Sequence, residues 1–460
     1  MNTKRKKLFL ITFAVTLLVI IAVYLGFTLH FKSRFYFGSY INGINYSNKT
    51  VSEVEDSISK DTADYVLQIK GRDNLTDIIS ADDIDYAYVS DGSIQKLKDA
   101  QNPFKWIFSM FSKNSNDMQV TTTYDEDKLD AKIQSLKFFQ SENNVAPTDA
   151  HTEYRGNSYK IVPETLGSKV KRNKLTKAVK SAIQNGDKKL SISKAGCYTE
   201  PSVTSDSNKL KELVNTLNKY AKVKITYNFE YTTEVVDSSY IRDWMEPDDK
   251  LEVNFNLEKV RSYIDSIAKI YNTYGKTRDF VDHDGKVIEI SGGDYGWLIN
   301  RADEVEHLVS TIKEGKDATI EPIYSQSARS RAKNDIGDSY IEIDLSKQHV
   351  WVYENGKLVV DTDCVTGNSS QGHDTPSGIF QITYKEKDAT LVGENYSSSV
   401  TYWMPFYYNV GLHDAAWRNS FGGSIYKNNG SHGCVNLPFS AAEKVFHHIE
   451  KGTPVVVYNS

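Results

Sequence analysis

The longest apolar stretch of the chain is residues 8–31, which contain no Asp, Glu, Lys or Arg. As a helix with a rise of about 1.5 Å per residue it would be about 36 Å long, enough to cross a bilayer. Basic residues fill positions 4–7, which favours a cytoplasmic N-terminus. A cleaved signal peptide is the alternative, although the run is long for one and no A-x-A-like site follows it. We therefore expect a cytoplasmic tail at 1–7, a single-pass transmembrane signal anchor at 8–31, and extracytoplasmic domains beyond it.

The next segment, residues 35–118, mixes helical and extended patterns and is expected to be an α+β segment. Its clearest element is a helix over Val51–Ile58, where apolar positions recur at helical spacing. Asn48 and Thr50 stand just before it as candidate N-caps, because their side-chain oxygens can accept hydrogen bonds from unpaired backbone N–H groups.

The middle of the chain repeats a pattern at an offset of 129 residues. Each copy reads as a turn, an amphipathic helix that ends at glycine, and a strand. Helices are also expected upstream, over 128–138 and 257–271. The matched positions are Gly167–Val170 with Gly296–Ile299, Val179 with Leu308, Ile183 with Ile312, and Gly186 with Gly315. We expect two α+β modules, at 119–200 and 201–325, followed by a polar linker at 326–338.

The last segment, residues 339–460, is rich in strand patterns and is expected to be mostly β. Asn355-Gly356 predicts a type I′ hairpin turn, because both central positions of that turn need a positive φ. One late helix is expected over 441–450, capped by Ser440 and ended by Gly452. The strands are expected at 340–344, 349–353, 358–365, 378–382 and 453–458.

Composition and charge exclude only a few classes of protein. The chain has 460 residues, 39% hydrophobic and 25% charged, which is ordinary for globular domains rather than disorder. A formal net charge of -5 gives no electrostatic reason to expect nucleic acid as a partner. Three cysteines do not make a disulfide scaffold, and Cys197 and Cys364 are expected to be small buried apolar residues.

The strongest chemical signal is Ser431–Leu437 (S-H-G-C-V-N-L), with Gly411–Ala415 (G-L-H-D-A) upstream. A thiol becomes a nucleophile when a base or a positive environment favours the thiolate, so Cys434 is the candidate nucleophile. His413 is the candidate base, because it can return on a neighbouring strand or loop. His432 lies only two residues from Cys434, which is poor for proton transfer, and is expected to shape the site.

The backbone around the cysteine has candidate roles too. Gly433 permits a close approach, and its N–H together with that of Cys434 is expected to form an oxyanion hole. Ser431 is expected to orient an imidazole through its hydroxyl or its carbonyl. A lone Cys or His is more often structural. However, glycine before a cysteine in a buried strand costs stability without a packing benefit, which favours catalysis.

Ser431–Leu437 resembles the signature of the L,D-transpeptidase (YkuD-type) catalytic domain, and Gly411–Ala415 resembles the upstream histidine motif of that family. Ile343–Gln348 with Tyr353–Gly356 is similar to its opening hairpin, and Thr375–Phe380 is similar to its Thr-Pro-x-Gly-x-Phe motif. The four motifs occur in the family's order. The tandem modules resemble the peptidoglycan-binding domains found upstream of this catalytic domain in some Gram-positive enzymes. They would bind glycan strands or act as stalks.

The resemblance implies a membrane-anchored transferase of peptidoglycan and cell wall biogenesis, and hence of cell shape, with no cofactor. Cys434 would attack a tetrapeptide stem before its terminal D-Ala, and His413 would protonate the leaving D-Ala. A side-chain amine of an acceptor stem would then take the thioester and form a 3→3 cross-link. Family members are commonly acylated by carbapenems at this cysteine, so the same is expected here.

Substrate contacts are expected from Trp403, Tyr408 and Asn436. Trp403 and Tyr408 are candidates for the wall of a stem-peptide groove, with core packing as the other interpretation. Many family members have Arg where Asn436 stands, and an Arg there could contact a substrate carboxylate. Asp414 is expected to belong to the backbone turn rather than to assist His413, because adjacent strand residues point to opposite faces.

Three other functions remain open. Water could take the same thioester and make the protein an L,D-carboxypeptidase. The catalytic domain could be inactive and leave a non-catalytic wall-binding protein. A zinc hydrolase using His413, His432, Cys434, His447 and His448 is the third, but their spacing fits no standard zinc pattern.

Overall fold

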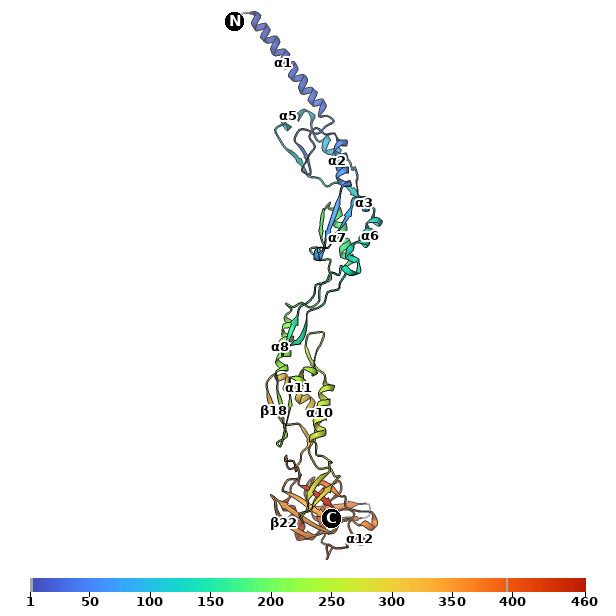
Figure 1. Ribbon diagram of the computed structural model, residues 1–460, viewed down its shortest axis with the longest axis vertical. Helices are drawn as coiled ribbons and strands as arrows, with labels where there is room; N and C mark the ends of the chain where they lie inside the picture. The colour runs from blue at the N-terminus through green and yellow to red at the C-terminus, as the bar shows by residue number, and fades with distance from the viewer. Residues whose placement is uncertain (1–2, 394–395) are drawn as a thin grey trace. The chain divides into compact units, whose positions relative to one another are not determined.

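The computed structural model describes residues 3–393 and 396–460 (Figure 1). They form two compact units. Unit 1 comprises residues 1–151 and 162–207, and unit 2 comprises residues 152–161 and 208–460. Each unit has its own hydrophobic core and is described by itself.

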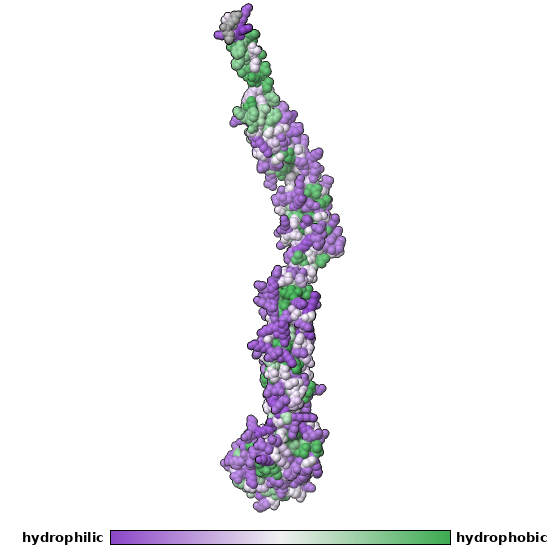
Figure 2. Space-filling model, turned by 60° about the vertical axis from the view of Figure 1, so that its left-hand side comes forward, coloured by the Kyte–Doolittle hydropathy of each residue, from purple (hydrophilic) through white to green (hydrophobic). Residues whose placement is uncertain are grey.

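Unit 1 begins with one long apolar helix, α1 (Thr3–His30). By length and composition it could cross a membrane, as an anchor or as a signal sequence, and none of its most apolar window is buried. Figure 2 shows its side chains as a hydrophobic surface. A helix that is apolar all round and uncovered by protein needs an apolar surrounding, which agrees with the expected membrane segment.

After α1 comes a small α+β segment. Strand β1 (Ser39–Ile41) lies between β2 (Ile44–Asn45) and β6 (Asn114–Asn116), and α2 (Val51–Ala63) packs beside them. Thr50 caps α2 in a capping box with Glu53, as the sequence predicts. Asn48, the other candidate cap, instead lies in the left-handed region with φ 64°.

The first module is built on three strands of unit 1. Strand β3 (Val66–Lys70) pairs antiparallel with β4 (Thr76–Ser80) and parallel with β10 (Lys189–Ser191). Helices α6 (Glu126–Ser135) and α7 (Arg172–Gln184) share its core. One sheet and one core therefore join residues on both sides of the boundary expected at 119. The repeat pattern does not reveal this pairing, because β3 and β10 are far apart in sequence.

The second module, in unit 2, has the same plan. Strand β11 (Ile225–Asn228) pairs antiparallel with β12 (Thr233–Val236) and parallel with β18 (Ala318–Ile320). Helices α10 (Leu257–Tyr271) and α11 (Arg301–Glu314) pack together beside this sheet (Figure 1). The helix–glycine–strand pattern of the repeat is confirmed, since α11 ends at Gly315 with φ 70°.

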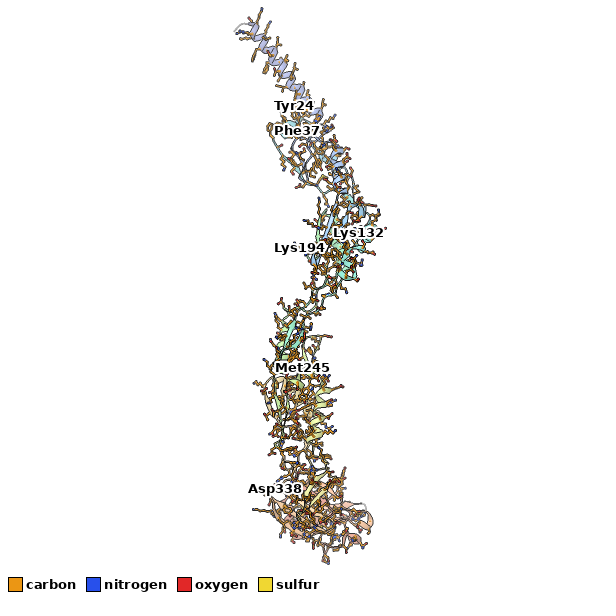
Figure 3. All side chains as sticks on the ribbon, in the orientation of Figure 1. Tyr24, Phe37, Lys132, Lys194, Met245 and Asp338 are labelled. Carbon is orange, nitrogen blue, oxygen red and sulfur yellow. The ribbon has the colours of Figure 1, made fainter. Side chains whose placement is uncertain are left out.

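Short elements complete the modules, and Figure 3 labels Met245 within the second one. In unit 1 they are α3 (Ala81–Ile84), β5 (Ala87–Tyr88), α4 (Ser93–Asp99), α5 (Trp106–Ser109) and β7 (Thr122–Thr123). In the second module they are α8 (Asn208–Ala221), α9 (Ser238–Trp244), β13 (Met245–Pro247), β14 (Val253–Phe255), β15 (Arg278–Val281), β16 (Val287–Ile290), β17 (Leu298–Ile299) and β19 (Tyr324–Gln326). The hairpin of β8 (His151–Arg155) and β9 (Ser158–Val162) lies mostly in unit 2.

Residues 326–338, expected to be a linker, are held against the rest of unit 2. They begin inside β19, which pairs with β17. Asp335 is 2% exposed and forms an ion pair with Arg278, and Ile336 is 1% exposed. The segment has no apolar periodicity because polar contacts, which periodicity does not register, hold it in place.

The C-terminal domain consists of two sheets around one apolar core. The first sheet has the order β22-β21-β20-β28-β23 and the second the order β24-β25-β26-β27. Their bounds are β20 (Tyr340–Asp344), β21 (His349–Glu354), β22 (Lys357–Asp363), β23 (Gly378–Gln381), β24 (Glu386–Gly393), β25 (Tyr396–Tyr407), β26 (Val410–Asp414), β27 (Val435–Leu437) and β28 (Pro454–Tyr458). The expected mostly-β domain is confirmed, and Asn355 and Gly356 both have positive φ at the predicted hairpin.

The late helix differs in its start. It is α13 (Phe439–His448), with Pro438 at the N-cap position and no side-chain cap, so the prediction that Ser440 caps it is wrong. Pro438 already supplies a fixed φ for a helix start, and the helix begins before Ser440 can act. A second short helix, α12 (Tyr426–Asn429), lies between β26 and β27 in the chain.

Candidate active site

Strand pairing brings the two predicted catalytic segments together. Strand β26 lies parallel to β27, with His413 opposite Asn436 and Leu412 opposite Val435. Cys434 directly precedes Val435 and therefore lies just before the start of β27, beside β26. His413, Ser431, His432, Cys434 and Asn436 line one pocket of about 200 Å³.

Cys434 sits in an apolar environment. It is 7% exposed and packs with Ala389, Val400 and Trp403. Burial raises the pKa of its thiol to about 11, and a hydrogen bond from the backbone N–H of Gly411 opposes this only in part. The resting group is therefore a thiol at neutral pH, and its reaction needs a base.

A chain of hydrogen bonds fixes the tautomer of His413. The Arg418 Nε–H, which can only donate, bonds to Asn436 Oδ1 at 2.8 Å, so the Asn436 amide must turn its NH₂ away from Arg418. That NH₂ lies 3.0 Å from His413 Nε2, which must accept. His413 Nδ1–H in turn donates to the Asp414 carbonyl at 2.8 Å. The imidazole is therefore neutral, with its lone pair on Nε2.

The environment of His413 keeps it neutral. Burial lowers the pKa of His413 below its ordinary value of 6.5, and the nearby charge of Arg418 adds to the effect, while the contact with Asp414 opposes it. The Cys434 Sγ–H meanwhile lies 3.5 Å from the Asn409 carbonyl. Proton transfer to Nε2 therefore requires two exchanges: the thiol must leave Asn409, and the Asn436 NH₂ must give up the Nε2 lone pair. Such tightening on substrate binding is common at catalytic sites.

Ser431 shapes the turn of the nucleophile rather than an imidazole. Its hydroxyl donates to the Cys434 carbonyl at 2.5 Å and accepts from the Gly433 N–H at 3.0 Å. Its carbonyl accepts from the Asn368 N–H. The expectation that Ser431 orients an imidazole is therefore wrong, because the tight turn brings backbone partners nearer. The Gly433 N–H is also occupied, which removes it from the expected oxyanion pair.

Gly433 is required by its backbone conformation. Its φ is +119°, in the region that favours glycine, whereas an added Cβ would meet little beyond a Val410 methyl group at 3.4 Å. Its carbonyl accepts the Thr375 hydroxyl at 2.7 Å, and that hydroxyl also accepts the Gly367 N–H. Thr375, the first residue of the Thr-Pro-x-Gly-x-Phe motif, thus supports the nucleophile turn.

The predicted substrate residues fall in different places. Trp403 is 5% exposed behind Cys434, with its ring 5.9 Å from that of His413, so it belongs to the core that supports the site. Tyr408 is 84% exposed, has φ 44°, and does not line the pocket. Tyr408 is therefore not a core residue, because it occupies the turn between β25 and β26, and its contact with a stem peptide stays a prediction.

His432 lies on the exposed rim of the pocket, where its ring is tilted by 35° to that of His373 at a centroid distance of 4.8 Å. Asp414 is buried, and its carboxylate accepts the N–H groups of Thr401 and Tyr402 at 2.8 and 2.7 Å. This carboxylate is therefore bonded to strand β25 rather than to a turn, and its charge opposes the lowering of the His413 pKa by burial. Among the described residues, no group of three or more His, Cys, Asp and Glu side chains is placed to hold a metal ion.

Arg418 and Trp417 line the pocket and were missed by the sequence analysis. Arg418 is half-buried, and burial lowers its pKa. It donates to Asn436 and to the Asn429 carbonyl, and no carboxylate in residues 3–393 and 396–460 pairs with it. The sequence contains one signal for Arg418, a basic residue five positions after the candidate base. This signal could not be interpreted before the fold placed Asn436 beside Arg418.

Two family profiles match the chain. The profile of the L,D-transpeptidase catalytic domain matches residues 338–457. The profile of a peptidoglycan binding domain matches twice, at residues 78–191 and 203–321. The second profile thus covers both modules, and its first match begins earlier than the predicted module start at 119.

Solved structures give a similar result. The chain is 38% identical to a cysteine-to-serine mutant of the Enterococcus faecium L,D-transpeptidase, over 54% of this chain and 100% of that one, with a TM-score of 0.47. It is 46% identical to the catalytic domain of the E. faecium L,D-transpeptidase acylated by ertapenem, over 26% of this chain and 98% of that one, with a TM-score of 0.25. No curated protein sequence matches the chain.

Proposed function

The chain belongs to the L,D-transpeptidase family, and from this premise we propose that it joins peptidoglycan stem peptides through a Cys434 thioester. The protein is an enzyme that acts on peptidoglycan, with upstream peptidoglycan-binding domains. The observation that carries the proposal is the shared pocket of Cys434 and a neutral His413 whose lone pair lies on Nε2.

The first half-reaction forms the thioester. The thiol proton passes to His413 Nε2 as Sγ attacks the carbonyl carbon before the terminal D-Ala of a tetrapeptide stem. The bond from that carbon to the D-Ala nitrogen breaks, and the imidazolium returns its proton to the leaving amine. Because Ser431 occupies the Gly433 N–H, we assign the oxyanion to the N–H of Cys434.

The second half-reaction transfers the acyl group. A side-chain amine of an acceptor stem attacks the thioester carbon and gives a proton to His413. The carbon–sulfur bond breaks, and His413 passes that proton to the departing sulfur, which restores the Cys434 thiol. The product is a 3→3 cross-link. Burial of the thiol supports transfer over hydrolysis, since Ala389, Val400 and Trp403 limit the access of water to the thioester.

Arg418 is proposed to bind the terminal carboxylate of the donor stem. It lines the pocket and has no carboxylate partner among the described residues. Asn436, which holds Arg418, stands two residues after Cys434, a spacing of about 6.6 Å in an extended segment. That distance suits a contact between Arg418 and the carboxylate of the D-Ala that leaves. Arg418 would thus supply the charge that many family members carry at the position of Asn436.

The location follows from the first helix. We propose that α1 is an uncleaved single-pass anchor with the N-terminus in the cytoplasm, because basic residues flank its start and it is long enough to span a bilayer. The two modules would then lie in the cell wall space, where they hold glycan strands or serve as a stalk.

Intact mass spectrometry of the full chain in detergent tests the reaction. We expect a disaccharide-tetrapeptide to give a dimer that has lost one D-Ala, and a carbapenem to add a single adduct. The carbapenem expectation is supported by the similar E. faecium domain that is acylated by ertapenem. Both products should be absent from the Cys434→Ala variant.

Each alternative has its own result. A tripeptide product without dimer would identify an L,D-carboxypeptidase. Neither product nor adduct, in a chain shown to be folded by circular dichroism, would overturn the enzyme proposal and leave a wall-binding protein.

A further inference from the structure

A short segment of unit 1 turns its apolar side chains outward. Residues 104–111, here called the apolar loop, include α5, and Phe104 lies 80 residues after Tyr24 of α1. Trp106 and Ser109 point inward, at 6% and 4% exposure. The exposed members are Phe104 (58%), Ile107 (40%), Phe108 (71%), Met110 (55%) and Phe111 (88%). This is the reverse of a soluble surface turn, because isolated soluble proteins rarely expose contiguous apolar patches.

The apolar loop is bonded to the end of α1. The Tyr24 hydroxyl donates to the Phe104 carbonyl at 2.6 Å, and Trp106 Nε1–H donates to the Tyr24 carbonyl at 3.3 Å. The Phe27 and Trp106 rings lie 4.8 Å apart. Figure 2 shows the hydrophobic surface of α1 continuing beside this loop, and Figure 3 labels Tyr24 and Phe37 in the same cluster.

The contact between the apolar loop and α1 falls where the proposed membrane span meets water on its extracytoplasmic side. A helix needs about 20 residues to cross the hydrocarbon layer, so a span that starts at Leu8 ends near Phe27. Tyr24, Phe27 and Trp106 then form an aromatic group at the boundary, where Trp and Tyr are enriched in membrane proteins.

We infer that the apolar loop inserts into the outer leaflet beside α1 and gives the protein a second membrane contact. The argument for lipid is continuity with α1, together with the exposed cations Lys105 and Lys113, which suit anionic headgroups at the edges of the loop. The inference rests on the proposal that α1 spans the membrane. Two attachment points would hold the first folded segment in one orientation against the bilayer, whereas α1 alone would leave that segment free to rotate.

Lipid quenching tests the inference on the full chain in vesicles of phosphatidylcholine and phosphatidylglycerol. An environment-sensitive fluorophore is attached to a cysteine introduced as Phe108→Cys, in a Cys434→Ala background. Cys197 and Cys364 are 0% exposed and should not react. Matched probes use Val15→Cys, which is 54% exposed in α1, and Val287→Cys, which is 67% exposed in the second module.

Lipids with brominated acyl chains should quench the probes at 108 and 15 several-fold more than the probe at 287. With a probe at Phe111→Cys, adding Phe108→Asp should reduce the quenching, whereas Phe108→Leu should preserve it, because only the carboxylate resists insertion.

The inference is overturned if the probe at 108 behaves like the one at 287 while the probe at 15 is quenched. A blue-shifted but unquenched probe at 108 also overturns it, since a second copy or another protein would then cover the loop. An unquenched probe at 15 removes the premise, because α1 would not lie in the bilayer.

Discussion

Unit 2 contains two half-buried arginines in opposite situations. Arg278 forms a double hydrogen bond to Asp335 at 2.8 and 2.7 Å, and its other N–H groups donate to the carbonyls of Thr273, Lys276 and Tyr295. Within the described part of the chain, the partners of Arg418 in the pocket are a side-chain amide and one backbone carbonyl. In the first network every nitrogen of the guanidinium has a partner and a carboxylate balances its charge, whereas in the second the half-buried guanidinium has no carboxylate among the described residues.

The difference separates structure from function. A buried charge costs free energy unless it is paired, so the complete Arg278 network is expected to hold residues 326–338 in place. The Arg418 guanidinium has no carboxylate partner among the described residues, so an anionic ligand can supply the balancing charge. The same pocket holds a buried thiol and a neutral imidazole. Breaking each centre should therefore affect different measurements.

The largest effect is expected at the nucleophile. Cys434→Ala should lower carbapenem acylation, followed by mass spectrometry, on the order of a thousandfold or more. Cys364→Ala is the matched control. Cys364 is fully buried in the core of the same domain, where burial raises the pKa of its thiol, and its loss should leave acylation intact. Acylation that survives Cys434→Ala would remove the assignment.

Removing the base should have the next largest effect. His413→Ala should slow acylation by about 100- to 10,000-fold, which is the usual range for a general base. Stopped-flow fluorescence with a carbapenem measures this rate. His432→Ala, at the rim of the pocket, should change it far less. Equal losses in the two variants would argue against His413 as the base.

Breaking the Arg278–Asp335 network should lower the stability of unit 2. Asp335→Ala leaves the Arg278 guanidinium buried without its partner and should destabilise unit 2 by about 3–5 kcal/mol. Urea unfolding followed by tryptophan fluorescence measures the loss. Asp338→Ala, an exposed carboxylate nearby, should change stability by no more than about 0.5 kcal/mol. Neither variant should alter the acylation rate of the protein that remains folded.

Removing the Arg418 guanidinium should change how well the enzyme distinguishes substrates with and without a terminal carboxylate. Arg418→Gln should slow acylation by a tetrapeptide with a free terminal carboxylate by about 10- to 100-fold, the value of a hydrogen bond to a charged group. The same peptide with a terminal amide should react equally with both proteins. Alkylation of Cys434 by iodoacetamide controls for thiol reactivity. A matching loss with the amide would assign Arg418 to positioning Asn436 alone.

The smallest effect concerns pH. Because burial lowers the pKa of His413, its neutral form persists as pH falls through 6.5. The acylation rate should therefore stay level down to about that pH and decline only below it. Arg418 pushes the pKa in the same direction, so Arg418→Gln should move the midpoint upward. A wild-type midpoint above 6.5 would contradict the buried neutral imidazole.

Local sequence determined much of this protein. The apolar run predicted α1, the Asn355-Gly356 pair predicted the hairpin turn, and the repeat predicted the paired helices α7 and α11. Four motifs in the family's order, including the one around Cys434, identified the family. These features depend on neighbours within a few residues, or on composition, so periodicity and turn chemistry reveal them.

Contacts between distant segments needed the tertiary structure. The pairing of β3 with β10 joins residues on both sides of an expected boundary, and the packing of 326–338 depends on Arg278. Ser431 was assigned to an imidazole because spacing cannot show that the turn of Gly433 captures its hydroxyl. Arg418 gains meaning only when two parallel strands set Asn436 opposite His413. The sequence thus supplied the reactive groups, and the fold decided which of them touch, because hydrogen-bond partners are chosen by distance in space rather than along the chain.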